Sequence, residues 1–125
     1  MIQKSFKFSN IQLNYKIWFS SEDGQNIMGD GKIRLLKTIN EQGSLKAATN
    51  LLKISYRKAW GDIKKAENIL GFQLINKLRG GPDGGSSSLT EEGQRLIISY
   101  DIFQKELNKF IGIASESFIN KLNKK

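Results

Sequence analysis

Apolar and polar side chains follow two different repeats along this chain, and each repeat predicts a different kind of element. Near the start, residues 11–19 alternate with a period of two, which is typical of a strand with one buried face. From residue 30 onward, the apolar positions recur at helical spacing and are interrupted by glycines and short polar stretches. We therefore expect one strand followed mainly by helices. The apolar positions of the strand are Ile11, Leu13, Tyr15, Ile17 and Phe19.

The first two helices are expected between residues 30 and 53. Asp30 is placed to cap the first helix, which runs to about Gln42 and ends at Gly43. Ser44 is placed to cap the second helix. Small side chains on the second helix let a neighbouring helix approach closely, as a tight helix-turn-helix requires. The apolar stripe of this second helix is Ala47, Ala48 and Leu51.

A third helix is expected from Ser55, which caps it, to Gly71, which stops it. Its core-facing stripe is Ala59, Ile63, Ala66 and Leu70. At about 100° per residue, the opposite face carries Arg57, Lys58, Gly61, Lys64 and Lys65. Gly61 has two interpretations. Either its missing side chain lets another molecule approach the backbone, or it is a tolerated weakness that costs about 1 kcal/mol against alanine.

A hairpin is expected after the third helix. Residues 72–78 form a strand that carries Phe72, Leu74 and Leu78 inward, and Ser88 and Leu89 begin the return strand. The glycine-rich segment 79–88 between them, RGGPDGGSSS, has few side chains to pack and is interpreted as the tip of a wing. Two helices, a turn and such a hairpin, all within residues 43–93, have the order of a winged helix-turn-helix.

The last helix is expected to be long. Thr90 caps it, Glu91 and Glu92 lie in its first turn, and it runs to about Leu122. A helix of about 33 residues is about 50 Å long, which exceeds the width of the rest of the domain. Its outer half therefore needs a partner, and we expect a homodimer; the alternative is a kink near Gly112. The candidate dimerisation residues are Leu96, Tyr100, Phe103, Leu107, Phe110 and Phe118.

Positive charge is concentrated on the helix-turn-helix and the wing. Eleven Lys and Arg residues stand against three acids between Lys32 and Arg79. That surplus of eight equals the net charge of the whole chain, +8 at pH 7. Such a localised surplus is the footprint of a surface that binds a polyanion, and a helix on it is sized for the major groove of DNA. The alternative is a solvated, lysine-rich surface that reflects the composition of the organism.

Several kinds of chemistry are disfavoured. The chain has no cysteine and no histidine, which removes thiol catalysis, Cys/His zinc sites and histidine acid–base chemistry. The glycine-rich segment lacks the Lys-Ser/Thr of a phosphate-binding loop, and the carboxylates form no compact pair. We expect no enzyme activity, no metal and no cofactor. No apolar run is long enough for a membrane span and no secretory leader is visible, so a cytoplasmic protein is expected.

The residues also carry a family resemblance. One motif resembles the winged helix-turn-helix of LysR-type regulators, and it consists of Gly43-Ser44-Leu45, Ala47-Ala48, Leu51, Ile54-Ser55, Ile63, Glu67, Leu70-Gly71, Leu74, Leu89-Thr90 and Gly93. A second resembles the DNA-binding domain of molybdate-responsive regulators of the ModE type, and it consists of Ile54-Ser55-Tyr56-Arg57-Lys58-Ala59-Trp60, the glycine-rich wing and Gly93-Gln94-Arg95-Leu96-Ile97. Together the two motifs cover most of the chain.

This resemblance implies a dimeric transcription factor, bacterial or archaeal, whose third helix enters the major groove while its wing contacts the flanking backbone. Arg57, Lys58 and Lys64 are the leading candidates for DNA contacts, and the wing candidate is Arg79. ModE-type regulators carry C-terminal oxyanion-binding domains that this sequence lacks, so no molybdate site is expected in this chain. The remaining candidates for DNA contacts are Ser55, Tyr56, Trp60 and Lys65.

The expected fold is mainly α with a small β component, a single winged-helix domain over residues 1–125. It comprises a strand at about 11–19, the helix-turn-helix and wing at 30–90, and a dimerisation helix at 90–122. The expected function is sequence-specific binding of double-stranded DNA to regulate transcription, with residues 55–70 as recognition helix and 79–88 as wing. The alternative is a winged-helix interaction or nucleoid-architectural module with little sequence preference.

Overall fold

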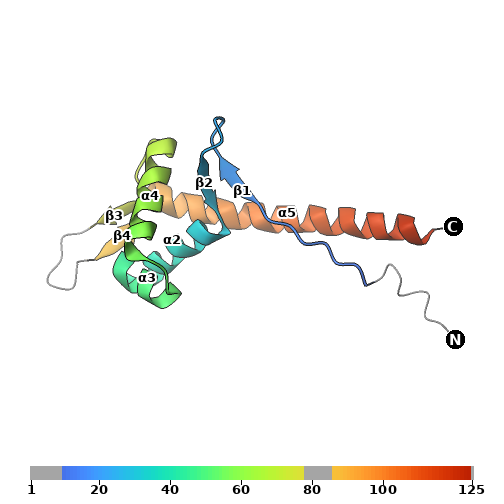
Figure 1. Cartoon of the computed structure of the whole chain (residues 1–125), viewed down its shortest axis with the longest axis horizontal. Coiled ribbons are helices and arrows are strands. Elements are labelled where there is room, and N and C mark those ends of the chain that lie inside the picture. The colour runs from blue at the N-terminus through green and yellow to red at the C-terminus, as the bar shows by residue number, and fades with distance from the viewer. Residues whose placement is uncertain (1–9, 78–85, 125) are drawn as a thin grey trace. The chain divides into compact units, whose positions relative to one another are not determined.

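The computed structural model describes residues 10–77 and 86–124, and its fold is a winged helix-turn-helix, mainly α with a small β component (Figure 1). The chain divides into two compact units. Residues Ile17–Tyr100 form one, here called the winged-helix unit. The other, the terminal unit, combines residues from 10–16 with residues from 101–124.

The winged-helix unit contains three helices, two small antiparallel sheets and the start of a fourth helix. Strand β1 pairs with β2, and β3 pairs with β4 (Figure 1). Helix α5 begins in this unit and continues into the terminal unit. In chain order the elements are β1 (Trp18–Ser20), β2 (Asn26–Gly29), α2 (Asp30–Gln42), α3 (Leu45–Leu52), α4 (Tyr56–Leu70), β3 (Ile75–Lys77), β4 (Ser87–Leu89) and α5 (Glu91–Asn123).

Most of the expected helix caps are present. The Ser44 hydroxyl accepts the Ala47 N–H at 2.9 Å, and the Ser55 hydroxyl accepts the Lys58 N–H at 3.1 Å. Gly43 and Gly71 end α2 and α4 with φ of 82° and 86°, in the left-handed region that glycine adopts without strain.

The cap expected for α2 is wrong. Gly29 is the N-cap, and Asp30 is the first helical residue. Because β2 runs directly into α2, no turn is present in which Asp30 could cap its own helix. Its carboxylate instead accepts a hydrogen bond from the Tyr100 hydroxyl at 2.6 Å, which links the start of α2 to α5.

The core lies between α2, α3, α4, the β3–β4 hairpin and the start of α5. Ala48 and Ala59 are almost fully buried, so α3 and α4 approach closely through small side chains as expected. The stripe on α3 differs from the prediction, because Leu51 is 59% exposed and Ala47 is half-buried. Leu45 points inward instead, and Leu52, seven residues later, packs on the same core. The face that carries these two leucines therefore buries more apolar surface than the face that carries Leu51.

The strands are shorter than expected. β1 covers only Trp18–Ser20, because its partner β2 is four residues long and, among residues 10–77 and 86–124, no other strand pairs with residues 11–17. β3 begins at Ile75, which is buried, whereas Phe72 is 38% exposed. Phe72 lies between the end of α4 and the start of β3, so it is not part of the alternating pattern of the strand. Leu78 lies outside the described residues.

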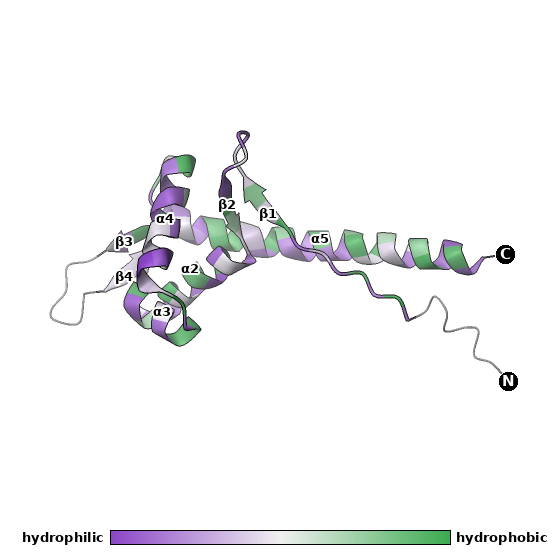
Figure 2. Ribbon diagram, viewed as in Figure 1, coloured by the Kyte–Doolittle hydropathy of each residue, from purple (hydrophilic) through white to green (hydrophobic). Residues whose placement is uncertain are grey.

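Helix α5 is continuous from Glu91 to Asn123 and includes Gly112. This agrees with the expected end near Leu122 and contradicts a break at the glycine. The Thr90 hydroxyl accepts the Gly93 N–H at 2.9 Å and so caps the helix as expected. Bands of hydrophobic residues recur along the helix (Figure 2).

Candidate nucleic-acid interface

Helix α4 presents a polar face whose centre is exposed. Ala59, Ile63 and Ala66 are buried against the core, as predicted from their spacing. On the opposite face Arg57, Gly61 and Lys65 are exposed. Ser55 and Tyr56, at the start of the helix, are also exposed. The structure therefore brings the candidate contact residues of segment 55–65 onto one helix and its cap.

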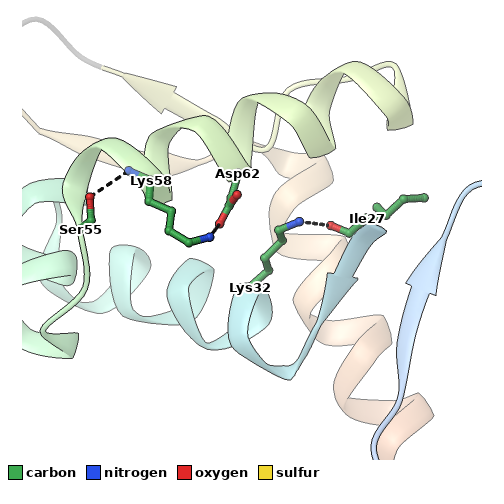
Figure 3. A network of polar contacts seen from close by, with 5 residues as sticks. All are labelled: Ile27, Lys32, Ser55, Lys58 and Asp62. Carbon is green, nitrogen blue, oxygen red and sulfur yellow. Dashed lines mark hydrogen bonds and ion pairs between the residues drawn. The ribbon is translucent and has the colours of Figure 1, made fainter. Parts of the chain in front are cut away.

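One flank of this face lies toward α2. The Lys58 ammonium is 3.4 Å from an Asp62 carboxylate oxygen, and these side chains are 76% and 40% exposed. Lys32, on α2, lies near the same pair and donates from Nζ to the Ile27 carbonyl at 2.9 Å (Figure 3). Burial lowers the pKa of Lys32, and the negative charge of Asp62 partly offsets this. Sequence reasoning did not single out Lys32, which lies on a different helix.

The other flank lies toward the β3–β4 hairpin. The Lys64 ammonium is 4.5 Å from the centre of the Trp60 ring and 3.2 Å from a Glu67 carboxylate oxygen. Trp60 is half-buried and packs against the core. A cation over an aromatic face and beside a carboxylate is held by both, so Lys64 is fixed in position on the helix.

Glu67 links α4 to the base of the hairpin. Its side chain is 7% exposed, and one carboxylate oxygen accepts the Leu74 N–H at 2.7 Å and the Ile75 N–H at 3.3 Å. Glu67 therefore faces Lys64 on its own helix and also anchors strand β3. Its place four residues after the buried Ile63 was a signal that the carboxylate faces inward.

The base of the hairpin is fixed on its other side as well. The Ser87 N–H donates to the Gly43 carbonyl at 2.9 Å, and the Thr90 N–H donates to the Leu74 carbonyl at 2.9 Å. The hairpin strands are therefore tied to the α2–α3 junction and to the start of α5. Arg79, the wing candidate, lies outside the described residues, as does most of segment 79–88.

The turn between α3 and α4 contains a further cation that the sequence did not reveal. Lys53 is exposed and has φ of 58°, the only positive φ of a non-glycine residue in segments 10–77 and 86–124. Its N–H donates to the Asn50 carbonyl at 3.3 Å, and the Ile54 N–H donates to the Thr49 carbonyl at 3.0 Å. The left-handed region costs an L-residue about 1–2 kcal/mol, yet a lysine occupies it immediately before α4.

The candidate dimerisation residues differ in their surroundings. Tyr100 is 4% exposed and lies in the core of the winged-helix unit, where its ring meets Phe19 edge-on. Leu96 also packs against this core. These two side chains are therefore covered within one chain, so the start of the heptad seam is not available to a partner. Phe103 and Leu107 are half-buried, whereas Phe110 and Phe118 are 68% and 58% exposed.

Other kinds of site lack support in the described part of the chain. Among residues 10–77 and 86–124, the acidic side chains form no group of three that could hold a metal ion. No helix in the same segments combines the length and the apolar composition needed to cross a membrane. The arrangement that the structure does offer is a basic helix beside a hairpin, which together suit a polyanion.

The comparisons with known proteins agree with this arrangement. The chain is 32% identical over 89 residues to the "molybdenum transport protein ModE" of Azotobacter vinelandii, a match that covers 71% of this chain and 33% of the relative. It is 34% identical over 92 residues to the "DNA-binding transcriptional dual regulator ModE" of Escherichia coli K12, covering 74% and 35%. The chain thus spans about a third of the length of these relatives.

A solved structure and a family model complete the comparisons. The crystal structure of ArgP from Mycobacterium tuberculosis matches with a TM-score of 0.45 at 21% identity, over 65% of this chain and 30% of that one. The model of the bacterial regulatory helix-turn-helix proteins of the lysR family matches residues 31–94, which extend from α2 to the first turn of α5. The resemblance inferred from the sequence is confirmed, and the chain belongs to the LysR family of bacterial regulatory helix-turn-helix proteins.

Proposed function

We propose that the chain binds double-stranded DNA sequence-specifically and regulates transcription in the bacterial cytoplasm. The observation that carries the proposal is the exposed, basic face of α4, with Arg57 and Lys65 on it, beside a hairpin whose base is anchored to the same helix. In a helix-turn-helix, the second helix lies in the major groove and positions on its outer face reach the bases. The printed name of the E. coli relative, a DNA-binding transcriptional regulator, supports the same function.

The proposed contacts fall into two groups. α4 and its cap supply groups to the major groove and its edges, and the hairpin supplies Arg79 to the flanking backbone. Lysine and arginine contacts to phosphate provide most of the affinity of such complexes, so binding weakens steeply with salt. The proposed contact residues are Ser55, Tyr56, Arg57, Lys58, Trp60, Lys64, Lys65 and Arg79.

We also propose that the protein acts as a homodimer through α5. Phe110, Ile113 and Phe118 on the second half of the helix are each more than half exposed. Large apolar side chains gathered along one exposed helix mark an association surface. A second copy of the same helix offers the same residues, which suits a two-fold interface. With Leu96 and Tyr100 used within the chain, Phe110 and Phe118 are the main contributors, flanked by Phe103 and Leu107.

The test of DNA recognition is selection of bound fragments from genomic DNA at about 150 mM salt, which suppresses non-specific binding. A sequence-specific dimer enriches one inverted repeat, with half-sites about one helical turn, ~34 Å, apart. Arg57→Ala should lower affinity for that repeat. An exposed lysine of α5, Lys121→Ala, serves as the matched control. Failure of the wild-type protein to enrich any motif would contradict the proposal.

The test of the dimer is Phe110→Asp, followed by sedimentation analysis. A buried charge at the interface should produce a monomer, while an unchanged circular dichroism spectrum shows that the helices persist. Glu106→Gln, on the same helix and already polar and exposed, is the control and should remain dimeric. A Phe110→Asp protein that sediments as the wild type does would rule out this interface.

A further inference from the structure

We infer that Gly61 is the point at which DNA comes closest to α4, that Arg57 and Lys65 supply the phosphate-attracting charge on either side of it, and that Lys58 and Lys64 contribute less charge because carboxylates of the same helix face them. This inference rests on the proposed function and deepens it, because it divides the candidate contacts of α4 into two classes. It also chooses between the two interpretations that the sequence left open for Gly61.

The first observation is that nothing within the described chain requires a glycine at position 61. Gly61 lies in the interior of α4, where glycine weakens a helix relative to alanine. It is not among the glycines with positive φ, and a Cβ built on it would have no heavy atom within 4 Å. Gly93 is the opposite case, because a Cβ there would lie 2.3 Å from the Leu74 carbonyl oxygen. Among the described residues, nothing therefore fills the space beside position 61, and this space is open to another molecule.

The second observation is the neighbourhood of each cation on α4. The charges of Lys58 and Lys64 are opposed by Asp62 and Glu67, at 3.4 Å and 3.2 Å. Arg57 and Lys65 form no ion pair within segments 10–77 and 86–124, and both are exposed. A lysine already facing a carboxylate neutralises a phosphate less completely, so its binding releases fewer of the counterions condensed on the DNA.

These two observations select the same strip of the helix. Arg57, Gly61 and Lys65 follow one another at intervals of four residues, which keeps them on one face with a rotation of about 40° per step. The face thus consists of a cation, an open stretch of backbone and a second cation. Lys58 and Lys64 lie on the two sides of this strip, where they pair with Asp62 and Glu67 of the same helix.

The experiment substitutes Gly61→Ala, with Gly112→Ala as matched control. Gly112 is also inside a helix, and a Cβ there also meets nothing within 4 Å. Both variants should unfold at higher urea concentration than the wild type, since alanine favours the helix. Only Gly61→Ala should lose affinity for the selected inverted repeat, by roughly tenfold or more. Gly61→Ala that is more stable and binds as tightly as the wild type would overturn the inference.

A second pair of variants tests the division of the lysines. Lys65→Ala should reduce the slope of log affinity against log salt concentration by about one, as loss of a phosphate contact does. Lys64→Ala should reduce that slope by clearly less than Lys65→Ala does, and equal reductions by the two variants would overturn the assignment. A wild type that binds no DNA motif refutes the proposed function and this inference together. A wild type that binds, with Gly61→Ala behaving identically, refutes this inference alone.

Discussion

Substitution of Glu67 should lower the free energy of unfolding of the winged-helix unit strongly. Its carboxylate is buried and accepts two backbone N–H groups, those of Leu74 and Ile75, at 2.7 Å and 3.3 Å. Glu67→Ala removes the oxygen that accepts both N–H groups at this buried site. The change therefore leaves two buried donors without a partner and releases the base of β3 from α4.

The magnitude follows from these contacts. Each buried donor left unsatisfied costs about 1–3 kcal/mol, so the pair costs about 2–6 kcal/mol. The ion pair with Lys64, which is 40% exposed, adds at most about 1 kcal/mol. A typical domain is stable by only about 5–15 kcal/mol, so Glu67→Ala should leave a marginal fold. Glu67→Gln keeps an oxygen that accepts both N–H groups and should cost about 1–2 kcal/mol.

The assay is urea unfolding followed by circular dichroism, with the free energies of unfolding of the three proteins compared. DNA affinity provides a second readout, because the two effects that Glu67→Ala has on it differ in sign. Removal of a negative charge from a basic surface would by itself strengthen binding, whereas displacement of the hairpin weakens it. A Glu67→Ala protein within about 1 kcal/mol of the wild type would refute the anchoring role, and so would a Glu67→Gln protein as unstable as Glu67→Ala.

Four further variants test other parts of the unit, each by its free energy of unfolding in urea. Gly93→Ala should destabilise by about 1–3 kcal/mol, because the new Cβ would lie 2.3 Å from the Leu74 carbonyl oxygen; stability equal to the wild type would mean that this approach is loose. Thr90→Val should cost about 1–2 kcal/mol, because it removes the cap of the Gly93 N–H and the bond to the Gln73 carbonyl. Thr90→Ser keeps the hydroxyl and should recover most of that loss, so a serine variant as unstable as the valine one would count against the cap. Lys53→Gly should stabilise by about 1 kcal/mol, since glycine adopts a φ of 58° without strain, and a loss of stability would show that the lysine side chain itself holds the turn.

Features that depend on local sequence could be predicted well. Ser44 and Ser55 cap helices through atoms three residues away, and Gly43 and Gly71 end helices through their own backbone conformation. Such contacts are encoded within one helical turn, so a short stretch of sequence contains both partners. The core stripe of α4 was visible for the same reason, because its period repeats over four turns.

Features that depend on distant partners could not be predicted from the sequence. Asp30 looks like a cap in isolation, but the structure uses its carboxylate to bind Tyr100, seventy residues away. The alternation over residues 11–19 favours a strand, yet only the part that meets β2 becomes one. In the candidate site, the cations of α4 and the carboxylates beside them are identifiable, because both ion pairs lie within one helix at spacings of three and four residues. The hydrogen bonds from the Leu74 and Ile75 N–H groups to Glu67 are not, because they depend on where β3 lies in space.

The hydrogen bonds around residues 73–75 also determine how the unit opens. The N–H groups of Leu74 and Ile75 are held by α4, while the carbonyls of Gln73 and Leu74 are held by Thr90 at the start of α5. Release of β3 would therefore also break the two hydrogen bonds that Thr90 donates, from its Oγ1 and its N–H, at the start of α5. The amides of Leu74, Thr90 and Gly93 should exchange with deuterated solvent at one shared rate, as members of a single cooperative unit. We therefore expect the base of the β3–β4 hairpin and the start of α5 to open and close together.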